Sequence, residues 1–173
     1  MRPITFIRLL TAGFMFALFI SGLTAIPLVN ETRFLSTLFP EGGKIDLWMD
    51  TIYQGIYHTS QQHPYLFYGY DWLAFAHFLF AILFIGAFRD PVRNAWLYDF
   101  GLIACALIIP FALIAGHYRG IPAWWRIIDC SFGIIGIIPL LICRRKISQI
   151  IKNKEVCQQK MNFPVLAGKT ANG

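Results

Sequence analysis

Ionisable side chains lie inside long apolar stretches of this chain, where burying a charge is unfavourable unless the charge has a function or a partner. His77 lies in the middle of one such stretch, with Asp71 six residues before it. An imidazole and a carboxylate could transfer a proton to a bound molecule or hold that molecule by hydrogen bonds. Two later stretches carry further polar groups near their junction, namely His117, Arg119, Arg126 and Asp129.

Four apolar stretches must position these groups, and each is long enough to cross a membrane, which takes about 20 residues. The chain of 173 residues is 57% hydrophobic and 14% charged, too few charges for a soluble domain. Continuous apolar runs favour helices over strands. We therefore predict an all-α integral membrane four-helix bundle. A single domain over residues 1–150 has spans at about 9–29, 65–88, 96–116 and 123–143, and residues 151–173 form a basic tail that is loose from Asn162 onward.

The positive charges predict which side of the membrane each loop occupies. Eleven of the fifteen Lys and Arg residues fall in the two termini and the 89–93 turn, and four fall in the other two loops or at their edges. Cytoplasmic loops carry the excess of Lys and Arg, so both termini are predicted to be cytoplasmic. The same placement explains the net charge of +6 by contact with membrane lipids, without nucleic acid.

Two other readings of the sequence are weaker. The first apolar stretch resembles a secretory signal peptide, but its run is longer than the usual ~7–15 residues and Leu23-Thr24-Ala25 is a poor cleavage site. The four cysteines are scattered and form no CxxC pair, so neither a zinc site nor a disulfide framework is predicted. No metal or other cofactor is predicted, with haem b as an alternative considered below.

The first outer loop, residues 30–64, is long for a connection, and long ordered loops often carry function. Apolar residues after Asp46 recur at spacings of one, three and four. This pattern predicts a short amphipathic helix, capped by Asp46, that lies on the membrane or over the mouth of the bundle. Aromatic residues near the span ends, Trp72, Trp96 and Tyr98 among them, are predicted to anchor the spans in the headgroup zone.

The outer ends of the second, third and fourth spans should meet, because successive spans alternate in direction. We therefore predict a polar pocket in the outer leaflet. Its ligand-binding residues would be His77, Asp71, His117, Arg119, Arg126 and Asp129, and its catalytic candidates would be His77, Asp71 and Asp129.

A purely structural reading of the same residues stays open. Arg126 stands one turn before Asp129 and could pair with it, and His77 could donate a hydrogen bond across the bundle. Small residues at helical spacing, Ala74 with Ala81 and Gly133 with Gly136, predict close helix contacts. A second polar group at the inner rim predicts a tight, solvated turn and comprises Arg89, Asp90, Arg93, Asp99 and Arg144.

Three functions fit this pattern, and the first is the binding of a lipid-like or small amphipathic molecule. The second is an acid/base enzyme that acts on a membrane-dissolved substrate. The third is a structural or assembly subunit, which could be oligomeric. A haem protein needs two imidazoles at one depth on facing helices, whereas His77 is central and His117 is at the outer rim.

The overall layout is similar to that of the emopamil-binding and sigma-2 receptor family, which includes sterol isomerases. Four spans, a long first outer loop and a basic tail carry the resemblance, with Ile26-Pro27 and Glu31 near the end of the first span as the local match. His77 stands about where that family would place an acid. The resemblance implies a sterol-like substrate for the enzyme alternative.

Overall fold

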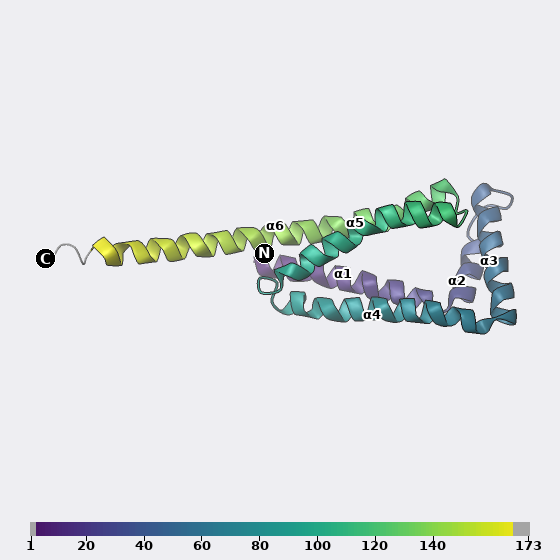
Figure 1. The fold of residues 1–173 in the computed structure, drawn as a ribbon, viewed down its shortest axis with the longest axis horizontal. Coiled ribbons are helices and arrows are strands. Elements are labelled where there is room, and N and C mark those ends of the chain that lie inside the picture. The colour runs from purple at the N-terminus through teal and green to yellow at the C-terminus, as the bar shows by residue number, and fades with distance from the viewer. Residues whose placement is uncertain (1–2, 168–173) are drawn as a thin grey trace. The chain divides into compact units, whose positions relative to one another are not determined.

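The computed structural model describes the backbone of residues 3–167 and the side chains of residues 3–159. Helices account for nearly all of this part of the chain, and it contains no strand, which confirms the predicted all-α class (Figure 1). The elements in order are α1 (Pro3–Ala25), α2 (Leu28–Ser36), α3 (Lys44–Gln62), the 3-10 helix η1 (Pro64–Phe67), α4 (Tyr68–Arg89), α5 (Ala95–Tyr118) and α6 (Ala123–Ala167).

Four of the described helical segments are long and apolar enough to cross a membrane. They are α1, η1 with α4, α5, and the first part of α6, with mean hydropathies of 1.9 to 2.2. The protein is accordingly an integral membrane protein with four candidate spans. The predicted number and order of the spans are confirmed.

The first span begins and ends earlier than the sequence predicted. It runs over Pro3–Ala25 instead of 9–29, because a proline tolerates the first turn of a helix but disfavours helical geometry in the residue before it. Pro27 therefore separates α1 from α2, a nine-residue helix that the sequence analysis did not predict.

The amphipathic helix of the first loop is present, but its predicted cap is wrong. α3 has 19 residues and begins at Lys44, with Gly43 in extended conformation as its N-cap. Asp46 lies in the first turn of the helix and accepts a hydrogen bond of 2.8 Å from the backbone N–H of Gly42. The carboxylate thus satisfies a donor ahead of the helix, where a negative charge also complements the helix dipole.

The helix that contains the fourth span continues beyond the end of the apolar run. α6 has 45 residues and continues without a break from the apolar stretch through Cys143 and on to Ala167, a length of about 65 Å at 1.5 Å per residue. The predicted loose tail is thus helical up to Ala167, and residues 168–173 lie outside the described residues. Figure 1 shows α6 as one rod whose first part runs beside α5.

The described chain divides into two compact units. Unit 1 comprises residues 3–14 and 84–167, and unit 2 comprises residues 15–83. The first half of α1, the end of α4, α5 and α6 thus form unit 1. The rest of α1, the helices α2 and α3, η1 and the start of α4 form unit 2.

The core of unit 1 contains a hydrogen-bonded polar pair. Tyr98 and Thr11 are 0% and 1% exposed, and their hydroxyl oxygens are 2.7 Å apart. Each hydroxyl also lies near a backbone carbonyl, that of Thr11 2.8 Å from Ile7 and that of Tyr98 3.4 Å from Ala87, so either of the two can donate in the shared bond. Tyr98 is therefore a core residue, and the prediction that it anchors the span in the headgroup zone is wrong.

In unit 1, an arginine of α1 binds the open carbonyls at the C-terminal end of α4. Arg8 donates to the carbonyls of Phe88 at 3.0 Å and Arg89 at 2.7 Å, at the end of α4. Asp90 accepts from the backbone N–H of Arg93 at 3.0 Å, as expected for a tight turn. Nearby, Arg144 pairs with Asp99 at 2.6 Å. A cation beside the last carbonyls of a helix is stabilising because those carbonyls have no helical partner.

Small residues allow α5 and α6 to pack closely, as the sequence predicted. A Cβ added at Gly133 would lie 2.5 Å from the carbonyl oxygen of Cys105, and one added at Gly136 would lie 2.7 Å from the Cys105 sulfur. In unit 2, a Cβ at Gly22 of α1 would lie 2.8 Å from the Ala74 carbonyl oxygen. These backbones approach so closely that a larger residue requires the helices to move apart.

The Tyr98–Thr11 hydrogen bond predicts a measurable coupling energy. We expect Tyr98→Phe and Thr11→Val each to destabilise the protein by about 1 kcal/mol. The double-mutant cycle should give a coupling of roughly 0.6–1.7 kcal/mol, the range for such bonds in membrane proteins. Unfolding in detergent measures both. Tyr118→Phe is the control, since Tyr118 is 84% exposed. A coupling near zero would show that the two hydroxyls do not stabilise each other.

Candidate functional site

His77 is held by its own helix. Its Nδ1 lies 2.8 Å from the carbonyl oxygen of Leu73, one turn earlier in α4. A carbonyl can only accept, so Nδ1 carries a proton and donates it in this hydrogen bond. The hydrogen bond predicted to cross the bundle from His77 is thus made by Nδ1 within α4. The Cβ of His77 lies next to Gly22 of α1: a Cβ added at Gly22 would be 3.0 Å from it.

Asp71 and His77 do not form an acid/base pair. Six residues of α-helix separate them along the axis by about 9 Å, and they lie on different faces. General acid/base partners must be within hydrogen-bond reach, about 2.6–3.2 Å, of a shared proton. Asp71 instead lies in the first turn of α4, in a hollow of about 280 Å³ lined by Tyr68, Asp71, Trp72 and Phe75.

Arg126 in unit 1 lies across α5. A Cβ added at Gly116 would be 2.6 Å from the Arg126 Cδ, so the glycine provides the space for this side chain. The Nη1 atom donates to the carbonyl of Leu113 at 3.2 Å, and Nε is buried with no hydrogen-bond partner among the described residues. The predicted ion pair with Asp129 is not found in the described part of the chain, where the recorded pair is Arg144 with Asp99.

His117 and Arg119 are exposed at the end of α5. Gly120 follows with a φ of +69°, the left-handed conformation that commonly ends a helix and that glycine adopts without strain. The turn that follows leads into α6, where Asp129 is partly exposed. His117, Arg119, Arg126 and Asp129 thus belong to unit 1, whereas Asp71 and His77 belong to unit 2. The gathering of all six in one pocket stays a prediction.

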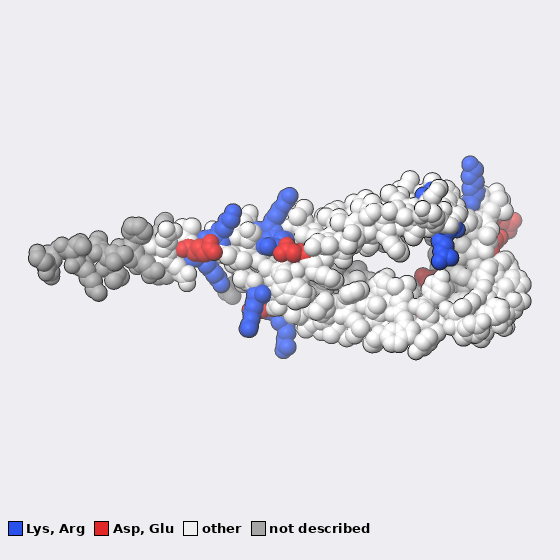
Figure 2. Space-filling view, in the orientation of Figure 1, with Lys and Arg blue, Asp and Glu red and all other residues white. Residues whose placement is uncertain are grey.

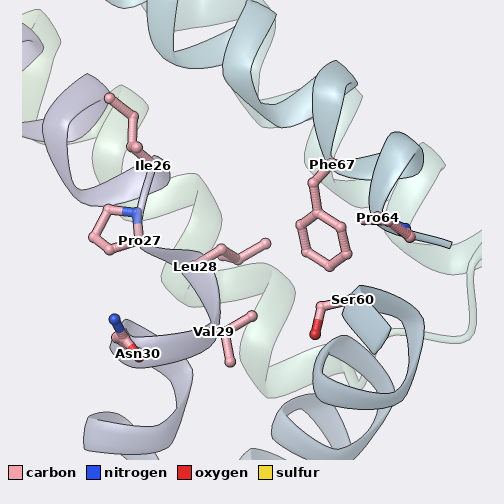
Figure 3. A pocket seen from close by; sticks show the side chains of 8 residues that line it. All are labelled: Ile26, Pro27, Leu28, Val29, Asn30, Ser60, Pro64 and Phe67. Carbon is pink, nitrogen blue, oxygen red and sulfur yellow. The ribbon is translucent and has the colours of Figure 1, made fainter. Parts of the chain in front are cut away.

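A second hollow in unit 2 was not predicted. It has a volume of about 250 Å³ and lies at the break between α1 and α2. We call it the elbow hollow; it is lined by Ile26, Pro27, Leu28, Val29, Asn30, Ser60, Pro64 and Phe67. Figure 3 shows Leu28 and Val29 extending from the α1–α2 side toward Phe67 and Ser60. Pro27 was the signal in the sequence, since a proline after a span predicts a bend in the chain.

The elbow hollow is mainly apolar with a few polar groups, the usual composition of a small-molecule site. Ser60 donates its proton to the carbonyl of Tyr57 at 2.7 Å, so its oxygen can still accept a hydrogen bond. Glu31 follows Asn30 in the first turn of α2, and partial burial raises the pKa of its carboxyl. The wall of the hollow can therefore take an apolar body and one or two hydrogen bonds.

Apolar side chains of the helices in the first loop are exposed. In α2, α3 and the loop between them, the exposed large apolar residues include Phe34, Leu38, Ile45 and Leu47. Such residues on amphipathic helices fit a position in the membrane interface. In the same two helices, Met49 and Thr32 are buried, and the buried Nε1 of Trp48 has no hydrogen-bond partner among the described residues.

The four cysteines are free thiols. Within the described residues no group of three or more His, Cys, Asp and Glu side chains is placed to hold a metal ion. His77 and His117, the pair considered for haem b, belong to different units, and a haem site stays untested.

Comparisons with known proteins give no family assignment: no family model, no curated protein and no solved structure matches this chain. The resemblance in layout to the emopamil-binding and sigma-2 receptor family therefore stays a prediction. Glu31, which carries part of that resemblance, lies in α2 next to the elbow hollow.

The packing of Arg126 over Gly116 predicts a specific loss of stability. Arg126→Ala should destabilise the protein by about 1–3 kcal/mol, because it removes both the stem that covers α5 and the donor to the Leu113 carbonyl. Arg119→Ala, at an exposed position, should change stability by less than about 0.5 kcal/mol. Thermal unfolding in detergent makes the comparison. Equal effects of the two substitutions would contradict the described role of Arg126.

Proposed function

We propose that this integral membrane protein binds a lipid-like or small amphipathic molecule at its outer membrane interface, with the apolar part in the elbow hollow. The observation that carries the proposal is the hollow itself, about 250 Å³ with predominantly apolar walls. A body of several carbons buried there gains roughly 0.8 kcal/mol for each CH₂ removed from water.

The surroundings of the hollow support an amphipathic ligand over a water-soluble one. The hollow lies where a candidate span ends at Ala25 and the next begins at Pro64, which is the level of the headgroups. The exposed apolar residues of α2 and α3 would hold these two helices in contact with lipid, so a ligand could enter the hollow from the membrane.

Geometry favours binding over acid/base catalysis. Asp71 and His77 are too far apart along α4 to share a proton, and Arg126 bonds to a backbone carbonyl. The enzyme and assembly alternatives have no specific observation in their favour.

The proposal includes an orientation in which both termini are cytoplasmic and the elbow hollow is on the outer side. The charges of unit 1 support it: Figure 2 shows mainly positive side chains, with some negative ones, where α6 passes the α4–α5 turn, and then an uncharged stretch along α5 and α6 before positive side chains appear again near the α5–α6 turn. Such an excess of Lys and Arg is typical of the cytoplasmic side.

Photolabelling tests ligand binding at the elbow hollow. A fatty acid with a diazirine on its chain, added to the full chain in nanodiscs, should label the peptides that contain Ile26–Asn30 and Pro64–Phe67. Val29→Trp should reduce this labelling at least tenfold, because it fills the hollow. Leu107→Trp is the matched control, since Leu107 is exposed on α5. Uniform labelling of all four spans that Val29→Trp does not change would overturn the proposal.

Thiol labelling tests the orientation. Cys157 is exposed and should react with a membrane-impermeant maleimide only after the cells are permeabilised. A cysteine introduced at exposed Lys44, in a chain with Cys157→Ser, should react in intact cells. The opposite pattern would show that the elbow hollow lies on the cytoplasmic side.

A further inference from the structure

We infer that the hollow around Asp71 binds an organic ammonium group, such as the choline headgroup of an amphipathic molecule. Tyr68, Asp71, Trp72 and Phe75 line this hollow of about 280 Å³. They recur at spacings of three and four residues, so they lie along one face of α4. This inference rests on the proposed function, because it names the headgroup class of the ligand.

Three aromatic rings stand in contact along this face. The ring centroids of Tyr68 and Trp72 are 6.0 Å apart with an interplanar angle of 87°. Those of Trp72 and Phe75 are 5.8 Å apart with an angle of 85°. All three side chains are exposed. The electron-rich face of an aromatic ring attracts a cation, most strongly for Trp, so the rings offer an attractive wall to a positive group.

Asp71 supplies the negative charge of this hollow. No salt bridge or hydrogen bond of its side chain is recorded among the described residues, where the recorded ion pair is Arg144 with Asp99. The carboxylate thus stands among three aromatic rings at the start of a membrane span. An unpaired charge next to apolar surface gains from a cation that displaces water without losing strong hydration of its own. Quaternary ammonium groups, which are weakly hydrated, meet this condition and are recognised in proteins by aromatic rings.

The chemistry of the hollow excludes the other simple occupants. A metal ion needs several oxygen, nitrogen or sulfur ligands, and the lining offers one carboxylate. An anion would be repelled by Asp71. A group without charge would gain at most a hydrogen bond from Asp71, without the attraction between opposite charges.

The location also fits a headgroup. Tyr68 directly follows Phe67, which lines the elbow hollow, so the two hollows belong to adjacent turns of one unit. Tyr and Trp at a span end lie at the level of the lipid headgroups. An ammonium group of a membrane molecule is found at the same level.

Choline itself tests the site without the apolar part of any ligand. The full chain is placed in nanodiscs of phosphatidylglycerol, which has no amine, and choline is followed by saturation-transfer difference NMR. The reference compound is 3,3-dimethyl-1-butanol, which has the same shape as choline and no charge. We expect saturable binding of choline and at least tenfold weaker binding of the neutral compound.

Two variants assign the binding to this hollow. Asp71→Asn keeps the shape and removes the charge, and Trp72→Leu removes the central ring. Each should weaken choline binding at least tenfold. Asp50→Asn is the control, because Asp50 is an exposed carboxylate on α3 of the same unit. Thermal unfolding establishes that each variant is folded.

Three results would overturn the inference: no saturable choline binding by the native chain, equal binding of the neutral compound, or unchanged binding by Asp71→Asn. The comparison of the two compounds on the native chain needs no variant to fold. Photolabelling of the elbow hollow is measured separately, so its success with failure of choline binding would reject the headgroup site alone. Failure of the photolabelling would reject the proposed function.

Discussion

Lipid offers no hydrogen-bond partner, and this constraint explains most of the polar contacts in the spans. Every backbone N–H and C=O in the hydrocarbon must form its hydrogen bond within the protein. A helix meets this requirement because its backbone groups bond to one another within the same segment. Side chains obey the same rule. Thr11 bonds to Ile7 of its own helix and to Tyr98, His77 bonds to Leu73, and Arg126 bonds to Leu113. Two of the residues that suggested chemistry, His77 and Arg126, thus have backbone carbonyls as their hydrogen-bond partners.

The same constraint leaves packing, and not the hydrophobic effect, to hold the spans together, because lipid tails are as apolar as the helices. Glycines face the neighbouring backbone at Gly133 and Gly22. Large residues such as Phe84 and Leu140 are buried in unit 1, where they lie against Gly101. The outward faces of α5 and α6 remain apolar and exposed, as expected of surfaces that contact lipid.

Much of the fold could be predicted from the sequence, because hydropathy over about 20 residues is a strong and local signal. The four spans followed from it. The helix of the first loop followed from the spacing of apolar residues after Asp46, and the close contacts at Gly133 and Gly136 followed from small residues at helical spacing. The end of α6 did not follow, because hydropathy marks the end of the apolar run at Cys143 and not the end of the helix, which continues through a polar stretch to Ala167. The helix α2 was missed because nine residues are too few to show a clear period.

The candidate site was harder to predict, because it depends on how side chains pair in space. Arg126 and Asp129 have the spacing of an ion pair, but Gly116 has no side chain and leaves the space in which the Arg126 side chain lies across α5. Tyr98 has the position of an interfacial anchor, but Thr11 on another helix gives its hydroxyl a buried partner. The elbow hollow depends on the bend at Pro27 and on Phe67, which are far apart in the sequence.

The central claim is that lipid solvates the outward faces of these helices while their polar groups turn toward protein. Spin labels at Leu107 and Phe111, exposed on α5, and at Leu97, buried on the same helix, test it in lipid vesicles. The account predicts frequent collisions of the first two labels with dissolved oxygen and few with a water-soluble nickel complex, and few collisions of the third label with either. Frequent collisions of the labels at Leu107 and Phe111 with the nickel complex would contradict it.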